Sequence, residues 1–194
     1  MHPDPLSLQA SRPPDGDAAC IRRVADKDRR AFDLLYRGYY RRLTRFLEQV
    51  THRPHLTEEV LNDTMLVVWR KAHTFDGTSR VSTWIFAIAY RKALKAIKRL
   101  GESSVAMPEE SLGLPSRDPE GEAMVRESRA RIGRALEALS PEQRAVVELT
   151  YYHGYAYREI AEIVHCPVDT VKTRMFHARR KLKTLLVADS EERA

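Results

Sequence analysis

The chain has 194 residues, with 33 Lys and Arg against 27 Asp and Glu, and a formal net charge of +6. Hydrophobic residues make up 43% of it and charged residues 31%. This composition is typical of globular domains and excludes a membrane protein or a disordered chain. No apolar run approaches the roughly 18 residues of a membrane-spanning helix, and no secretory leader is expected. Two cysteines are too few for a disulfide framework or a four-cysteine zinc site. We therefore expect a reduced, cytoplasmic protein of one domain or two small ones.

The positive charge is unevenly distributed along the chain. Residues 27–101 carry a net +9 and residues 128–186 a net +5, whereas residues 102–127 between them carry −5. Basic blocks attract polyanions such as nucleic acid, because neutralising phosphates releases counterions. Charge alone does not separate this reading from two ordinary solvated helix surfaces, so periodicity and motifs must decide.

The first basic block is predicted to be helical throughout. Apolar residues recur every three or four positions between residues 27 and 50, which defines one face of a helix. Pro54 breaks that pattern, and a second helix is expected over residues 57–71 with Thr57 as its N-cap. A turn at Asp76-Gly77 then precedes a third helix over residues 82–100.

Residues 101–124 are predicted to form a flexible acidic linker. The stretch is rich in glycine, proline, serine and carboxylates, and without a periodic apolar face it cannot bury enough surface to offset its chain entropy. Further on, Ser140, Pro141 and Gln143 mark a helix start, with a serine N-cap, proline at N1 and glutamine closing a capping box. The expected organisation is all-α, with a disordered N-terminus at 1–17, helical domains at 18–100 and 125–187, and a tail at 188–194.

Residues 157–182 fit a helix-turn-helix. A short helix over residues 157–164 precedes a turn at His165, a residue type that tolerates a left-handed backbone better than most. In the second helix, a wheel places apolar side chains on one side and polar or basic ones around Phe176 on the other. A helix that enters a DNA major groove needs an apolar face that packs on its own domain and a polar or basic face that contacts the DNA. An ordinary amphipathic surface helix would show the same two faces, but the preceding helix and turn favour DNA binding.

The segment between the second and third helices, residues 75–84, combines small hydroxyl residues with Arg80 and two bracketing aromatics, Phe75 and Trp84. Capture of an unpaired base needs stacking surfaces and polar edges, which such a loop offers. Taken alone the pattern is weak, since the two aromatics equally suit a place in the core.

Together these blocks resemble the sigma-70 family of bacterial RNA polymerase specificity subunits, specifically the short extracytoplasmic-function (ECF) group. The residues that carry the resemblance are Leu56–Lys71, Phe75–Ala89, Leu139–Arg144, Tyr157–Val164 and Pro167–Leu182. It implies a region 2-like helical bundle and a region 4-like helix-turn-helix domain joined by the acidic linker. It also implies a subunit without enzymatic activity, cofactor or metal, whose partners are core RNA polymerase, promoter DNA and an inhibitory anti-sigma factor.

The resemblance further implies three sets of binding residues. The set that docks on core polymerase is Glu59, Asn62, Asp63, Leu66 and Trp69. The set that recognises the melted minus-ten element is Thr78, Ser79, Arg80, Val81, Ser82, Arg91, Lys92 and Lys95. The set that reads the minus-thirty-five element is Asp169, Thr170, Lys172, Thr173, Arg174, His177 and Arg180.

The chain departs from the family pattern at several of these positions. Tyr90-Arg91 stands where many relatives have an asparagine, and Lys95 replaces a common aspartate. Val81 stands where an aromatic is frequent, and Asp169 where a glycine is frequent. An anion at the front of a recognition helix repels phosphate but can accept from a cytosine amino group. For these reasons no promoter sequence is predicted.

Three other classes of protein compete with this interpretation. A stand-alone DNA-binding regulator would share the helix-turn-helix but leaves residues 56–84 and the acidic linker unexplained. An enzyme is disfavoured because the chain has no glycine-rich phosphate loop, HExxH or Gly-x-Ser-x-Gly motif. His52 and His55 have a metal-like spacing, but they straddle Pro54 without a cysteine or carboxylate at helical spacing, which favours a surface pair. A purely protein-binding adaptor or anti-sigma factor does not account for the two basic faces.

Overall fold

The computed structural model describes residues 16–102 and 131–191, and all regular secondary structure in these ranges is helical, which confirms the expected all-α class. The elements are α1 (Gly16–Ala25), α2 (Arg29–Thr51), α3 (Pro54–Lys71), the 3-10 turn η1 (Ala72–Thr74), α4 (Val81–Glu102), α6 (Pro141–Tyr151), α7 (Tyr157–Val164) and α8 (Val168–Glu191), and residues 131–137 are helical too. Most of the predicted N-terminal segment and acidic linker lies outside the described residues. Within those residues, no helix combines the length and the apolar character that crossing a membrane requires.

Helices α1 to α4 form the first bundle. Asp28 starts α2, because its carboxylate accepts the backbone N–H groups of Arg30 and Ala31 at 2.8 and 3.1 Å. His52 ends the helix in the left-handed region with φ 50°, and α3 then opens at Pro54. The expected apolar face of α2 is buried at Leu35, Tyr39, Leu43, Phe46 and Val50, whereas Phe32, at its N-terminal end, is only half-buried.

Three boundaries differ from those expected from the sequence. Helix α3 begins at Pro54 rather than near Thr57, because proline at the first helical position needs no hydrogen-bond partner and its fixed φ suits a helix. Thr57 is buried within that helix, where its hydroxyl donates to the Arg53 carbonyl oxygen at 3.3 Å. Helix α1 starts at Gly16, because its apolar side is buried against α2, and α8 continues to Glu191, into the expected tail.

The second bundle contains the predicted helix-turn-helix. Ser140 and Gln143 close the predicted capping box, with their reciprocal hydrogen bonds at 3.3 and 3.1 Å. Helices α7 and α8 are joined by the turn at His165, which adopts φ 52° as the sequence predicts. The inward faces of these two helices are buried at Ile160, Ile163, Val171, Met175 and Ala178.

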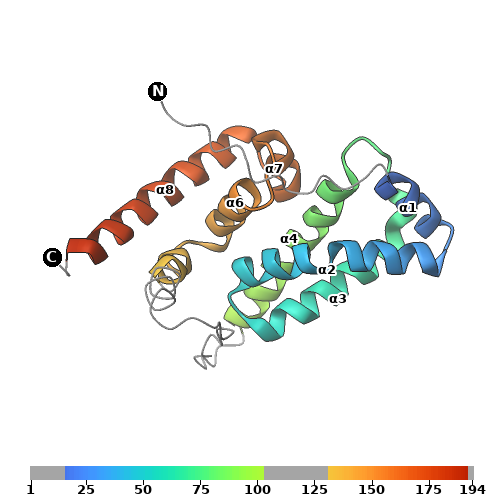
Figure 1. Ribbon diagram of the computed structural model, residues 1–194, viewed down its shortest axis with the longest axis horizontal. Helices are drawn as coiled ribbons and strands as arrows, with labels where there is room; N and C mark the ends of the chain where they lie inside the picture. The colour runs from blue at the N-terminus through green and yellow to red at the C-terminus, as the bar shows by residue number, and fades with distance from the viewer. Residues whose placement is uncertain (1–15, 103–130, 192–194) are drawn as a thin grey trace, which may run out of the picture.

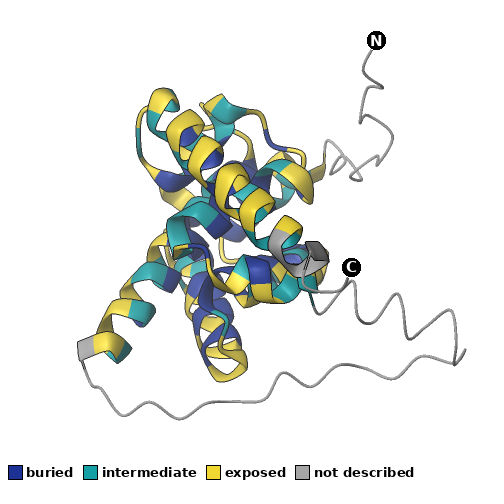
Figure 2. Cartoon of the chain, turned by 90° about the vertical axis from the view of Figure 1, so that its left-hand side faces the viewer, coloured by how far each residue is buried: buried dark blue, intermediate teal, exposed yellow. Residues whose placement is uncertain are grey.

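The two bundles share one buried core. Helix α6 packs on α2 and α7 packs on α4, so that both lie between α8 and the first bundle (Figure 1). Buried Arg144 of α6 donates to the carbonyl oxygens of Val50 and Leu139 at 2.9 and 3.2 Å. Because the last carbonyl groups of a helix have no partner within it, this guanidinium group caps α2 and joins the bundles. Figure 2 shows the buried residues on the inward sides of the helices and the exposed ones outside.

Candidate nucleic-acid and protein interfaces

A groove of about 500 Å³ lies between α2 and α3. The side chains of Phe32 and Trp69 meet edge-on in it, with ring centroids 5.2 Å apart. Lys27 places its ammonium group 5.4 Å from the centre of the Trp69 ring, and Leu66 is 43% exposed beside it. The full lining is Arg29, Phe32, Tyr36, Asn62, Met65, Leu66 and Trp69. An apolar, aromatic hollow of this kind on a helical surface suits a protein partner.

The groove brings together only part of the predicted polymerase-binding set. Asn62, Leu66 and Trp69 line it, but Glu59 and Asp63 lie on the other side of α3, where they face α4. Glu59 accepts from Arg99 at 2.6 Å, and Asp63 accepts from Lys92 at 2.9 Å. Arg99 is exposed and Lys92 half-exposed on the basic side of α4, so the predicted polymerase and DNA surfaces adjoin there.

Sequence reasoning missed the contribution of α2 to this groove. Phe32 and Tyr36 supply its aromatic wall, and the Tyr36 hydroxyl donates to the Asn62 side-chain oxygen at 3.4 Å. The signal was a four-residue spacing of aromatics at Phe32, Tyr36 and Tyr40, which places them along one stripe of the helix. That stripe is only partly buried, unlike the neighbouring apolar face of α2.

The loop before α4 has a defined conformation. The Asp76 carboxylate accepts the Thr78 backbone N–H at 3.0 Å and the Thr78 hydroxyl at 2.8 Å, and these bonds lower the pKa of Asp76. Gly77 adopts φ 79°, which only glycine accepts readily. The rings of Phe75 and Trp84 lie 5.6 Å apart, and both are half-buried. The loop therefore offers the exposed Thr78 and the half-exposed Ser79 on an ordered turn.

Some of the remaining residues of the predicted minus-ten set are exposed on α4, and others contact α7 or the turn before it. Arg91 and Lys95 are exposed on α4, whereas Val81 and Ser82 are 5% and 3% exposed. The guanidinium group of Arg80 pairs with the carboxylate of Glu159 in α7 at 3.0 Å. The buried Ser82 faces the hydroxyl of Tyr155, in the turn before α7, and its side chain acts to lower the pKa of that hydroxyl, against the stronger effect of burial.

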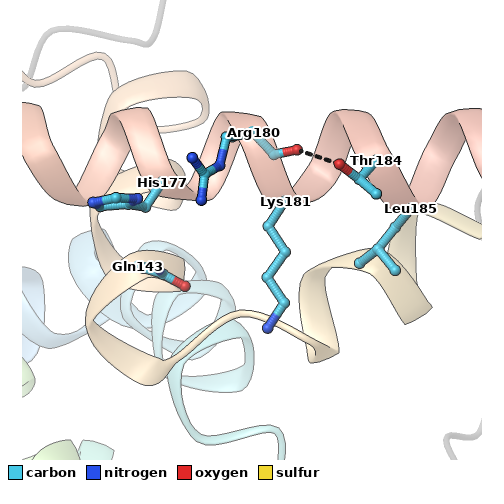
Figure 3. A pocket seen from close by; sticks show the side chains of 6 residues that line it. All are labelled: Gln143, His177, Arg180, Lys181, Thr184 and Leu185. Carbon is cyan, nitrogen blue, oxygen red and sulfur yellow. Dashed lines mark hydrogen bonds between the residues drawn. The ribbon is translucent and has the colours of Figure 1, made fainter.

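The front of α8 forms a polar surface with the N-terminus of α6. A groove of about 470 Å³ is lined by Ser140, Glu142, Gln143, Asp169, Thr170, Thr173, Arg174 and His177. An adjoining hollow of about 490 Å³ is lined by His177, Arg180 and Lys181 of α8 and by Gln143 of α6 (Figure 3). The Lys181 ammonium group reaches the segment before α6, where it donates to the Ala138 carbonyl oxygen. Asp169 accepts from Lys172 at 2.9 Å, which offsets its negative charge. Phe176, which is 62% exposed, adds an apolar side chain to this polar surface.

Arg174, like Thr170, is half-buried, whereas the other members of the predicted set are exposed. One of its amino groups lies 3.9 Å from the Cys166 sulfur, and its charge acts on the Tyr90 hydroxyl of α4. Burial raises the pKa of Tyr90 to about 12, so that its hydroxyl stays neutral. Tyr90, one of the departures from the family pattern, is thus a packing residue between α4 and α8.

A buried polar cluster lies between α2, α4 and α6. The Arg45 guanidinium group donates to Glu148 at 2.8 Å and stacks 3.5 Å from the centre of the Tyr152 ring. His153 packs edge-on against Phe86 with centroids 4.8 Å apart. Burial, together with two guanidinium groups of α2, lowers the pKa of His153 to about 3, whereas burial raises the pKa of Glu148. His153 is therefore neutral in the folded chain.

The chain matches two family models. Residues 35–102 match sigma-70 region 2, and residues 129–182 match sigma-70 region 4. The ECF RNA polymerase sigma factor RpoE of Cereibacter sphaeroides is 30% identical over 169 residues, which cover 85% of this chain and 92% of that protein.

Two solved structures share the fold. CnrH in complex with the cytosolic domain of CnrY superposes with a TM-score of 0.68 at 24% identity, over 90% of this chain and 99% of that one. The sigma factor RpoE from Bartonella quintana, in complex with the anti-sigma factor NepR, gives 0.62 at 24% identity, over 81% and 98%.

The fold has two helical bundles, the second of which contains a helix-turn-helix, and the sequence matches sigma-70 regions 2 and 4. Together these features define a bacterial transcription initiation factor. The chain belongs to the sigma-70 family and, within it, to the ECF RNA polymerase sigma factors. Members of this group bind core RNA polymerase and direct it to promoters.

Proposed function

We propose that the α2–α3 groove is the main contact with core RNA polymerase, and that the α4 N-terminal segment and the front of α8 recognise the two promoter elements. The observation that carries this proposal is the separation of an apolar, aromatic groove from two polar, basic surfaces on one compact chain.

The groove suits a protein because its centre is aromatic and its rim is polar. Trp69 and Leu66 offer apolar surface that becomes buried when the partner binds. Arg29 and Asn62, at the edge of the groove, can fix the orientation of the partner. Glu59 and Asp63, on the α4 side of the same helix, form a separate acidic contact with the polymerase, once partner cations compete with Arg99 and Lys92.

The exposed face of α8 suits duplex DNA because it combines hydrogen-bond donors, a hydrogen-bond acceptor and an exposed aromatic side chain. Arg180 and His177 are placed to reach base edges or phosphates, and Phe176 is placed to touch a thymine methyl group. Lys172 is tied to Asp169 in the free chain and is available to phosphate once that weak surface pair opens.

The loop before α4 suits the unpaired minus-ten strand. The exposed Thr78 and Ser79 offer hydroxyl groups, and Arg91, Lys92 and Lys95 supply positive charge along α4. Promoter opening then follows from differential affinity, because a surface that binds the single strand more tightly than the duplex shifts the equilibrium toward melting. This role involves no bond-breaking chemistry, no cofactor and no catalytic residue, and it places the chain in the cytoplasm with its polymerase.

An anti-sigma factor is a further proposed partner. A solved structure with the same fold is a complex between a sigma factor and an anti-sigma factor. The helical surfaces that the promoter and polymerase would use here offer such an inhibitor a direct competitive site.

A mobility-shift experiment tests the proposal against the stand-alone regulator. Genomic DNA fragments are incubated with the chain, with core polymerase, and with both. We expect a sequence-specific shift only when both proteins are present. Tight, specific binding of duplex DNA by the chain alone would overturn the proposal and support the regulator.

A further inference from the structure

The first turn of α8 carries an exposed carboxylate group. Asp169 is the second residue of this helix, and its side chain is 89% exposed. It lines the groove of about 470 Å³ between α8 and the N-terminus of α6, together with Thr170 and Thr173. In a helix-turn-helix, the N-terminal residues of the second helix are the ones that reach base edges in the major groove. Asp169 therefore lies where a side chain reads sequence.

Four exposed side chains follow one another along the outer side of α8. Steps of four, three and four residues place them on one stripe of the helix, which consists of Asp169, Thr173, Phe176 and Arg180. The stripe begins with a carboxylate, continues with a hydroxyl group and an aromatic ring, and ends with a guanidinium group. The groups that DNA must offer thus change along the helix, from donors near Asp169 to acceptors near Arg180.

The polar groups at the start of this stripe are hydrogen-bond acceptors. The Thr173 hydroxyl donates its proton to the backbone carbonyl oxygen of Asp169 at 2.9 Å, so its oxygen is left to accept. An ionised carboxylate can only accept. One oxygen of Asp169 pairs with the Lys172 ammonium group at 2.9 Å, and the other points to a different partner. Two neighbouring acceptors require an amino group on the DNA.

The four bases differ in how well they meet this requirement. In the major groove, guanine presents the acceptors N7 and O6, and thymine presents the acceptor O4, so both repel a carboxylate. Adenine places its amino group beside the acceptor N7, whereas cytosine presents the N4 amino group without a neighbouring acceptor. A carboxylate at the start of α8 therefore favours cytosine over the other three bases.

We propose that Asp169 is a specificity-determining residue, whose carboxylate accepts a hydrogen bond from the N4 amino group of one cytosine in the minus-thirty-five element. The inference rests on the DNA-reading role that the proposed function gives to α8. Lys172, which is 60% exposed, turns from Asp169 to a backbone phosphate when the weak surface pair opens. The pair thus separates into one base contact and one phosphate contact.

A purely structural role for Asp169 predicts a different result. A carboxylate in the first turn of a helix is stabilised by the positive end of the helix dipole. Loss of that effect changes the DNA affinity to the same extent for every sequence, whereas loss of a base contact changes the preference at one position. Base preference, not overall affinity, is therefore the readout.

The test uses the full chain bound to core RNA polymerase and a pool of random-sequence duplex DNA fragments. Bound fragments are recovered and sequenced for the parent chain, Asp169→Asn and Glu162→Gln, with core polymerase alone as the background. Asparagine has the shape of aspartate but pairs through its amide group with N6 and N7 of adenine. Glu162→Gln is the matched control, because it removes the same charge from an exposed position of α7.

We expect the parent chain to enrich cytosine about tenfold over the other bases at one position of the upstream motif, the size of one good base contact. Asp169→Asn should exchange this cytosine for adenine and retain the other positions of the motif. Glu162→Gln should retain the motif of the parent chain.

Two other results would overturn the inference and leave the proposed function intact. These are an identical motif in the parent chain and Asp169→Asn, and a loss of affinity in Asp169→Asn that is equal for all sequences. If no motif depended on the chain at all, the proposed function would be wrong, and the inference would fall with it.

Discussion

Arg45 of α2 and Glu148 of α6 form an ion pair of 2.8 Å, although 103 residues separate them in the chain. The Glu148 side chain is only 10% exposed, and the Arg45 side chain, at 45%, covers it from the solvent side. Burial raises the pKa of Glu148 while Arg45 acts in the opposite direction. The pair thus holds a buried carboxylate at the junction of the two bundles.

Removal of Arg45 should leave that carboxylate without its partner. We expect Arg45→Ala to lower the free energy of unfolding by about 1–2 kcal/mol, less than for a fully buried pair because solvent screens the exposed guanidinium group. Arg41→Ala, at an exposed position of the same helix, should change it by no more than about 0.5 kcal/mol. Urea unfolding measures both, and equal losses in the two variants would contradict a specific role for the pair.

Stability should fall on acidification because His153 is buried neutral. Its pKa is about 3 in the folded chain against 6.5 for the unperturbed group, so between these values the unfolded chain binds the extra proton. The free energy of unfolding should therefore fall as the pH drops below 6.5, by about 2 kcal/mol at pH 5 relative to pH 7.5. Unfolding curves recorded over this range measure the slope.

A variant comparison isolates this contribution. Glu148 acts with the opposite sign at lower pH, because its raised pKa makes the folded chain bind that proton more readily. His153→Gln should flatten the slope between pH 7 and 5, whereas His73→Gln, at an exposed position, should leave it as in the parent chain. A slope that survives in His153→Gln would assign the pH dependence to other groups.

Leu66 should contribute to polymerase binding and little to folding. Truncating an apolar side chain in the α2–α3 groove to alanine removes contact area that only the complex buries, so Leu66→Ala should weaken binding of core polymerase about tenfold. Leu34→Ala is the control, because Leu34 is 60% exposed on α2 and outside the groove. Equilibrium binding of labelled chain to core polymerase gives the ratio. Similar losses in the two variants would contradict the groove as the docking site.

Arg180 should affect promoter reading without affecting polymerase binding. Arg180→Ala should lower promoter-specific transcription about tenfold or more, the usual effect of losing one base or phosphate contact. The neighbouring Arg179 donates to the Tyr151 hydroxyl at 2.9 Å, so Arg179→Ala serves as a matched control with little expected effect on transcription. If Arg180→Ala instead weakened polymerase capture, the assignment of α8 to DNA would be wrong.

Local signals predicted the second bundle well. The Ser140–Gln143 capping box and the left-handed turn at His165 both depend on a few adjacent residues, and both occur as predicted. The start of α3 differs from the expected one because proline, which breaks a helix at an interior position, is equally suited to its first turn.

The contacts between the bundles could not be predicted from periodicity. A wheel shows that Ser82 and Tyr90 lie on one side of α4, but not that Tyr155 and Arg174 cover them from another part of the chain. For the same reason the sequence does not show that, within the predicted polymerase-binding set, Glu59 and Asp63 face α4 while Asn62, Leu66 and Trp69 line the groove. Asp63 instead faces Lys92, a long-range pair that no local pattern records.

Run-off transcription on genomic fragments, with purified core polymerase and with or without the chain, shows whether the chain directs core RNA polymerase to promoters. We predict discrete start sites that require the chain and that are lost in Arg180→Ala. Identical transcripts with and without the chain, in the presence of a core polymerase shown to bind it, would mean that the chain does not direct promoter recognition.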